Sequence, residues 1–134
     1  MRNTLHKHLG FSREDIRENN RLIAKLACEK ISEVDVVFVP IISPYIEDRA
    51  MARSMIGEKF VELYINCPLE DCIRRDPKGN YKKAISGKID NFIGIADSNP
   101  YEPPLNPELE IKTNEYNLEH CVAVIVDYLN KSEI

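Results

Sequence analysis

Residues 60–66, Phe60-Val-Glu-Leu-Tyr-Ile-Asn66, form a short and largely apolar run. Such a run is typical of a strand that is covered on both faces in a parallel sheet. A similar β-branched run, Val34-Asp-Val-Val-Phe-Val-Pro40, comes earlier, and a third strand is predicted at Leu109–Lys112. Helical patterns separate the three runs. This alternation predicts an α/β fold with a parallel sheet and right-handed crossovers.

The helical segments around these strands carry their own start and stop signals. The first is predicted to begin at Ser12, which can cap a free backbone amide, and to run to about Ser32. Its apolar positions lie on one face at helical spacing: Ile16, Ile23, Leu26, Ala27 and Ile31. Further helices are predicted at Glu47–Ile56, Pro68–Arg75, Asn80–Ser86 and Leu118–Leu129. Four prolines within residues 97–107 predict an extended loop there.

Length and composition indicate one soluble globular domain, because the chain has 134 residues, of which 43% are apolar and 30% charged. No apolar run is long enough to cross a bilayer, and the first twenty residues are too polar for a signal peptide, so a cytoplasmic protein without membrane contact is expected. The net charge of −4 argues against a general nucleic-acid binder. The four cysteines form no C-x-x-C pair and are expected to be reduced and buried, and the histidines predict no metal site.

Basic residues are concentrated in one segment, residues 74–88, which holds six basic side chains and one acid, Asp76. Ligands of open α/β sheets gather at the carboxyl ends of the strands, and this segment follows one of them. It could therefore form an anion site, or a lid over polyphosphate. The alternative interpretation is a basic helix that only faces water.

Two aromatic residues, Phe11 and Phe92, are flanked by glycine or polar residues and could offer flat faces for a purine. Taken singly, each could equally fill the core. Polar residues around the first helix could hold a sulfate or phosphate, or form surface salt bridges: Arg2, Arg17, Asn19 and Arg21.

Taken in order, seven segments of the chain resemble the adenylylsulfate kinase family. These kinases use ATP to phosphorylate the 3′-hydroxyl of adenosine 5′-phosphosulfate (APS). The product is 3′-phosphoadenosine 5′-phosphosulfate (PAPS), an intermediate of sulfate assimilation. The segments are Leu9-Gly-Phe-Ser12; Glu18-Asn19; Ile42-Ser-Pro-Tyr45 with Asp48-Arg49; Cys67-Pro68; Arg75-Asp-Pro-Lys-Gly79 with Tyr81-Lys-Lys-Ala84; Phe92-Ile-Gly-Ile95; and Pro100-Tyr-Glu-Pro103.

The resemblance implies a role for individual residues. Phe11 and Phe92 are similar to the two rings that sandwich the adenine of APS, and Arg2 and Asn19 to its polar contacts. Ile42 and Ser43 correspond to a loop whose main chain meets APS, and Lys82 to a lid lysine near the phosphosulfate. Arg75, Lys78 and Gly79 resemble residues on the nucleotide-binding side of the family's site and in the lid that covers it. The family also implies ATP and Mg²⁺ as cofactors, and a chain that can pair as a homodimer.

Two motifs of the family are absent from these residues. The family binds ATP phosphates with a loop of the form G-x-x-x-x-G-K-[ST], and the 134 residues contain none. An Asp-Gly-Asp motif that serves the metal and the attacking hydroxyl would lie just before Met1. We therefore expect residues 1–134 to be a single partial domain with an incomplete P-loop kinase-like sheet that lacks the phosphate-loop strand. No catalytic residue is assigned, and the chain alone is expected to be inactive and of low stability.

A further departure concerns Ile16, which stands where the family usually carries a substrate-binding arginine. Two other functions stay open. The chain could be a non-catalytic APS-binding module or regulatory subunit, or it could belong to a different small-molecule kinase, acting on shikimate or a nucleoside, that shares the lid.

Overall fold

The computed structural model describes residues 8–131, which form two compact units. The first unit comprises residues up to 60 together with residues 90–103, and the second comprises residues 61–89 together with those from 104 onward. Each unit thus draws on two separate stretches of sequence, and the two are described in turn. No helix among residues 8–131 combines the length and the apolar content that crossing a bilayer demands.

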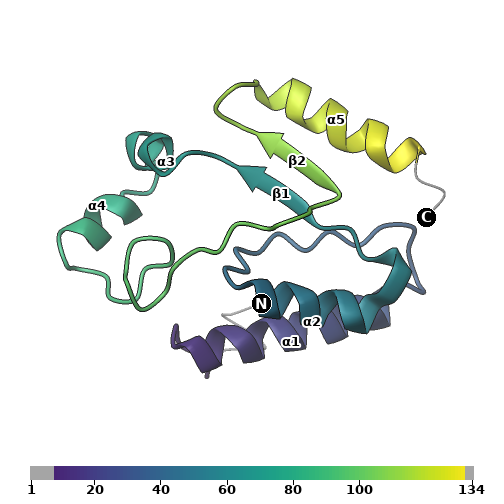
Figure 1. The fold of residues 1–134 in the computed structure, drawn as a ribbon, viewed down its shortest axis with the longest axis horizontal. Coiled ribbons are helices and arrows are strands. Elements are labelled where there is room, and N and C mark those ends of the chain that lie inside the picture. Colours follow the sequence, from purple (N-terminus) through teal and green to yellow (C-terminus); the bar gives the residue numbers. More distant parts are fainter. Residues whose placement is uncertain (1–7, 132–134) are drawn as a thin grey trace. The chain divides into compact units, whose positions relative to one another are not determined.

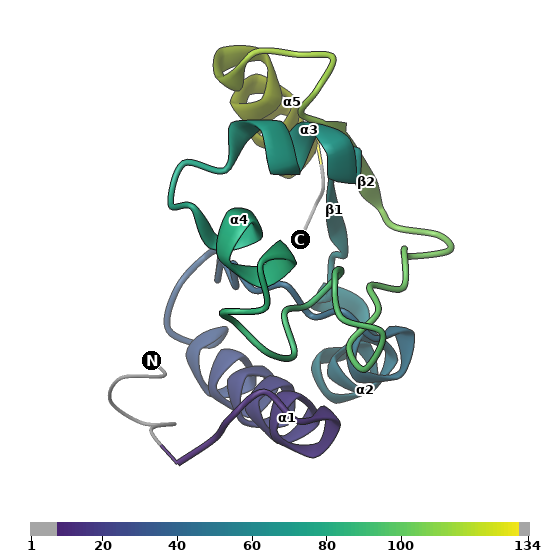
Figure 2. The same cartoon turned by 90° about the vertical axis from the view of Figure 1, so that its left-hand side faces the viewer.

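The first unit is built on two helices, α1 (Arg13–Lys30) and α2 (Ile46–Ile56), which lie side by side in Figures 1 and 2 and are followed by the short helix η1 (Gly57–Lys59). The predicted start of α1 is confirmed, because the Ser12 hydroxyl accepts a hydrogen bond from the Asp15 amide at 3.1 Å. The buried face of α1 includes Ile16, Ile23 and Ala27, as the apolar spacing predicts.

The prediction of a strand at residues 34–40 is wrong. This segment has no regular secondary structure, and Phe38 is 66% exposed. The chain bends next to it, since the Ile41 amide donates to the Val39 carbonyl at 3.0 Å in a three-residue turn. A strand requires a neighbour to satisfy its amides and carbonyls, and within residues 8–131 no strand pairs with this segment. Apolar composition alone therefore did not produce a strand.

The second unit contains the sheet, in which β1 (Leu63–Asn66) pairs in parallel with β2 (Leu109–Lys112), as Figure 1 shows. The register places Ile65 opposite Ile111. Helix α5 (Leu118–Lys131) packs on β2, where Ile111 and Cys121 are buried. The α/β class and the parallel pairing are confirmed. The burial predicted for residues 60–66 is wrong, because β1 is at most half-buried and Ile65 is exposed.

Two short helices follow β1, namely α3 (Leu69–Arg75) and α4 (Asn80–Ile85), and a turn through Asp76 and Gly79 joins them. Gly79 has φ of 65°, in the left-handed region that glycine adopts at little cost. Its amide donates to the Asp76 carbonyl at 3.0 Å. The Asp76 carboxylate accepts from the amides of Tyr81 and Lys82 at 3.1 and 3.0 Å, and so caps α4.

A buried carboxylate joins α1 to α2. Asp48 is 1% exposed and accepts two hydrogen bonds from Arg13 Nη1, at 3.0 and 3.1 Å. Asn20 Nδ2 donates a third at 3.1 Å. The Arg13 guanidinium also lies 3.8 Å from the centre of the Tyr45 ring, in cation–π geometry. The charge that α2 buries is thus paired and hydrogen-bonded by α1.

Replacing Asp48 by alanine should lower the free energy of unfolding by about 3 kcal/mol, because Arg13 and Asn20 would lose their shared buried partner. Urea unfolding followed by circular dichroism measures this. The matched control is Glu47→Ala, since Glu47 pairs with the same arginine at 3.3 Å but is 78% exposed. Its expected cost is below about 1 kcal/mol. Equal costs for the two variants would contradict the role assigned to Asp48.

The cap of α4 should respond to pH. The Lys82 amide is the main cause that lowers the pKa of Asp76; the amides of Tyr81 and Asn80 add to this, and partial desolvation opposes it. A carboxyl whose pKa falls on folding stabilises the folded state above its unfolded pKa, and that contribution is lost as the pH falls through the folded value. The amide proton shifts of Tyr81 and Lys82 should therefore titrate with a midpoint below the ordinary value of 3.8. Asp76→Asn should abolish the titration, and a midpoint above 3.8 would refute the cap.

Candidate functional site

The two aromatic segments predicted to bind a purine are joined by Asn99. Phe11 lies immediately before α1 and is 53% exposed, whereas Phe92 lies in the loop 90–99 and is half-buried. The Asn99 side chain is only 2% exposed, and its Nδ2 donates to the carbonyls of Phe11 and Asn91 at 3.0 and 2.9 Å. The structure therefore brings together the backbones that carry Phe11 and Phe92.

Asn99 is also bound on its oxygen side. The Tyr45 hydroxyl donates to Asn99 Oδ1 at 2.7 Å, and Gly94 donates its amide to the Asn99 carbonyl at 2.8 Å. Burial raises the pKa of Tyr45, although the Arg13 cation opposes the rise, so this hydroxyl stays a donor at neutral pH. Asn99 was not predictable as a site residue from the sequence, because an asparagine before a proline is ordinary in a loop and has no local signature of burial.

The loop Ile42–Tyr45 is fixed by the buried side chain of Arg49. Its Nη1 donates to the Ser43 carbonyl and its Nη2 to the Glu102 carbonyl, both at 2.7 Å. The Glu102 amide donates in turn to the Pro44 carbonyl at 2.8 Å. Ser43 has φ of 41°, an uncommon conformation for a residue with a side chain, and Ile42 next to it is exposed. Arg49 therefore sets the main-chain path of a predicted substrate loop.

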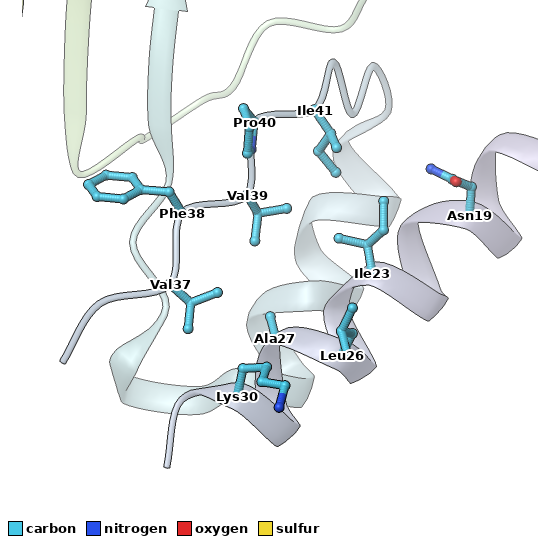
Figure 3. Close-up of a pocket in the computed structure, with 10 residues that line it drawn as sticks. All are labelled: Asn19, Ile23, Leu26, Ala27, Lys30, Val37, Phe38, Val39, Pro40 and Ile41. Carbon is cyan, nitrogen blue, oxygen red and sulfur yellow. The ribbon is translucent and has the colours of Figure 1, made fainter. Parts of the chain in front are cut away.

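Asn19 is buried in α1 and lines an apolar groove of about 460 Å³ between that helix and residues 37–41 (Figure 3). Figure 3 shows Asn19 at the Ile41 end of the groove and Lys30 toward the other end. The remaining lining is apolar: Ile23, Leu26, Ala27, Val37, Phe38, Val39, Pro40 and Ile41. Asn19 thus supplies the polar group nearest the 42–45 loop in the groove lining.

Ile16, where the resemblance predicts an arginine, is 3% exposed and belongs to the buried face of α1. Arg17 is exposed on another face of the helix. The isoleucine therefore stabilises the packing of α1, and the guanidinium of Arg17 lies on a different face of the helix from position 16.

Arg75 lies where the two strands end. Its Nη2 donates to the Thr113 carbonyl at 2.7 Å, and Thr113, directly after β2, donates its amide to the Asn66 carbonyl at the end of β1. The sequence predicted an anion site at this place, the carboxyl ends of the two parallel strands. Lys78 and Lys82 of the same basic segment are exposed. Such a surface can attract an anion, and a solvated basic helix is also compatible with it.

The predicted site residues fall into two groups. Phe11, Asn19, Ile42, Ser43 and Phe92 belong to the first unit. Arg75, Lys78, Gly79 and Lys82 belong to the second unit. Arg2 lies outside the described residues.

The described residues do not fit a triphosphate or a metal ion. Within residues 8–131, no group of three or more His, Cys, Asp and Glu side chains is arranged to hold a metal. The glycines with positive φ, which are Gly57, Gly79, Gly87 and Gly94, are far apart in sequence and form no glycine-rich phosphate loop. The residues present offer single cations, not a cradle of backbone amides.

Comparison with known proteins gives a consistent result. The family "Adenylylsulphate kinase" matches residues 1–112. The adenylyl-sulfate kinase of Clostridium acetobutylicum is 44% identical over 134 residues, covering 100% of this chain and 66% of that protein. A probable adenylyl-sulfate kinase of Halalkalibacterium halodurans is 46% identical, with 99% and 65% covered. The chain therefore spans slightly less than two thirds of these two curated relatives.

Among solved structures, the chain is similar to the APS kinase of Mycobacterium tuberculosis in complex with AMPPNP and APS. The TM-score is 0.83 at 40% identity, with 98% of this chain and 75% of that chain covered. A family match over most of the chain, whole-chain identity above 40% and a shared fold all agree with the seven segments found in the sequence. The chain belongs to the adenylylsulfate kinase family.

Proposed function

We propose that these residues bind APS as the acceptor in the reaction of this family, which transfers the γ-phosphate of ATP to the APS 3′-hydroxyl. The observation that carries the proposal is the buried side chain of Asn99, which holds the Phe11 and Phe92 segments together. A pair of aromatic residues fixed in this way can stack on a purine, and each base–ring contact is worth about 1–3 kcal/mol in proteins that bind single strands.

The other residues supply polar contacts in this proposal. Asn19 and Arg2 contact the nucleoside, and the main chain of Ile42 and Ser43 meets the substrate on the loop that Arg49 fixes. Lys82 neutralises the phosphosulfate from the basic segment. Chain pairing as a homodimer and a cytoplasmic location also belong to this proposal.

Other residues are assigned to ATP, the phosphate donor. We assign Arg75, Lys78 and Gly79 to a lid over the ATP phosphates. Because these 134 residues contain no phosphate-binding loop, we propose that this chain alone binds APS but does not transfer phosphate, and that ATP and Mg²⁺ are held only when such a loop is supplied. When bound, Mg²⁺ supplies charge neutralisation at the phosphates.

Titration calorimetry with APS should give saturable binding to the 134-residue chain. Phe92→Ala should weaken that binding about tenfold, since one stacking contact is lost. Met55→Ala is the matched control, because Met55 is an exposed apolar residue of the same unit that belongs neither to the proposed site nor to the groove beside Asn19. Absence of binding, or equal losses in both variants, would refute the APS site. ATP-dependent formation of PAPS by the chain would refute only the proposed inactivity.

Asn99→Ala should weaken APS binding about tenfold or more, because the carbonyls of Phe11 and Asn91 and the hydroxyl of Tyr45 lose a common partner. Binding is measured where circular dichroism shows the variant to be folded, so that a loss of affinity reports positioning of the aromatic segments. Ser98→Ala in the same loop removes the bond of 2.8 Å to Asn91 Oδ1 and should change affinity less than about twofold, because this bond is exposed. Unchanged affinity in folded Asn99→Ala would contradict the positioning role.

A further inference from the structure

Two free cysteines, Cys67 and Cys72, lie at the start of α3. Pro68 caps this helix, so Cys67 is the residue before the cap and Cys72 the fourth residue of the helix. Side chains at these two positions commonly pack against each other. Here the Cys72 amide donates to the Pro68 carbonyl at 3.1 Å. The Cys72 thiol donates to the Cys67 carbonyl, with a distance of 3.8 Å between the sulfur and the oxygen. The Cys67 side chain also lies near enough to the Cys72 thiol to raise the pKa of Cys72.

A third side chain, Tyr81 of α4, lies beside this pair: burial raises the pKa of Tyr81, and the neighbouring Cys72 side chain raises it further. The backbone amide of Tyr81 is held by the Asp76 carboxylate. These three residues therefore link the end of β1, helix α3 and helix α4, all within the second unit. Burial raises the pKa of Cys72, and the neighbouring Cys67 side chain adds to the rise, so the Cys72 thiol stays protonated at neutral pH.

From this geometry we propose that Cys67 and Cys72 are a modification site, a dithiol that a small hydroperoxide oxidises to an intramolecular disulfide. Both thiols are half-buried, which leaves access for a molecule of that size. The proposal is independent of APS binding.

The reaction proceeds in two steps. The Cys67 sulfur attacks one oxygen of the hydroperoxide and the O–O bond breaks. The Cys67 thiol proton passes to the other oxygen, which leaves as an alcohol or water, and Cys67 becomes a sulfenic acid. The Cys72 sulfur then attacks the Cys67 sulfur, the S–O bond breaks, and the Cys72 proton leaves with the hydroxyl group as water. Two thiols are oxidised to one disulfide, and one hydroperoxide is reduced.

The disulfide changes what Tyr81 contacts. A disulfide sulfur has no proton to donate and carries no thiolate charge, and its formation draws the Cys72 sulfur toward Cys67, so the surroundings of the Tyr81 side chain change. Because Tyr81 lies in a helix of only six residues, oxidation loosens α4 and the basic residues that it carries.

The first test uses hydrogen peroxide on the double variant Cys28→Ser, Cys121→Ser, in which only the proposed pair remains. Its mass should fall by that of two hydrogen atoms, both thiols should disappear together, and dithiothreitol should restore them. Peptide mapping of oxidised wild-type chain should show the same Cys67–Cys72 link, which covers the case of a poorly folded variant. Oxidation of one cysteine to sulfinic acid while the other stays a thiol, or a disulfide formed only between chains, would overturn the proposal.

The second test measures hydrogen exchange in the reduced and oxidised wild-type chain. The amides of α4 should exchange faster after oxidation, to the extent seen in reduced Tyr81→Phe, whereas those of α1 should not change. Unchanged exchange in α4 despite complete disulfide formation would overturn the coupling to this helix.

Discussion

The buried carboxylate of Asp48 is the constraint on which the first unit depends. A charge removed from water is tolerated only where partners neutralise it and satisfy its lone pairs, and Arg13 and Asn20 of α1 do both. The next residue, Arg49, holds the main chain of Ser43 and Glu102. Two consecutive residues of α2 therefore fix the position of α1 and the path of the loop of residues 42–45.

Elements with local signals were predictable from the sequence. Ser12 caps α1, Gly57 follows α2 with positive φ, and the strand Leu109–Lys112 has the predicted bounds. The segment Val34–Pro40 could not be judged in this way, because a strand is defined by its neighbour, and the sequence of one segment does not say whether a neighbour is present. The same limit explains why β1 is less buried than its apolar composition indicated.

The residues of the candidate site come from the resemblance, whereas the contacts that hold them do not follow from the sequence. The resemblance pointed to Phe11, Phe92 and the segment Ile42–Tyr45, and it included Asp48-Arg49 without giving that pair a role. Coordinates show that Arg49 and Asn99 hold the others through contacts that span 6 to 88 positions in the chain. A side chain that binds distant carbonyls has no periodicity or spacing by which the sequence could reveal it.

The interleaving of the two units has a consequence for synthesis on the ribosome. The first unit needs residues 90–103, and the second pairs strands whose flanking residues Glu62 and Glu108 are 46 positions apart. Neither unit can close before residues 90–112 have emerged, so the nascent polypeptide stays open until these residues have been made. During that interval its apolar segments are available to chaperones, and the speed of translation becomes a factor in how much native protein is recovered.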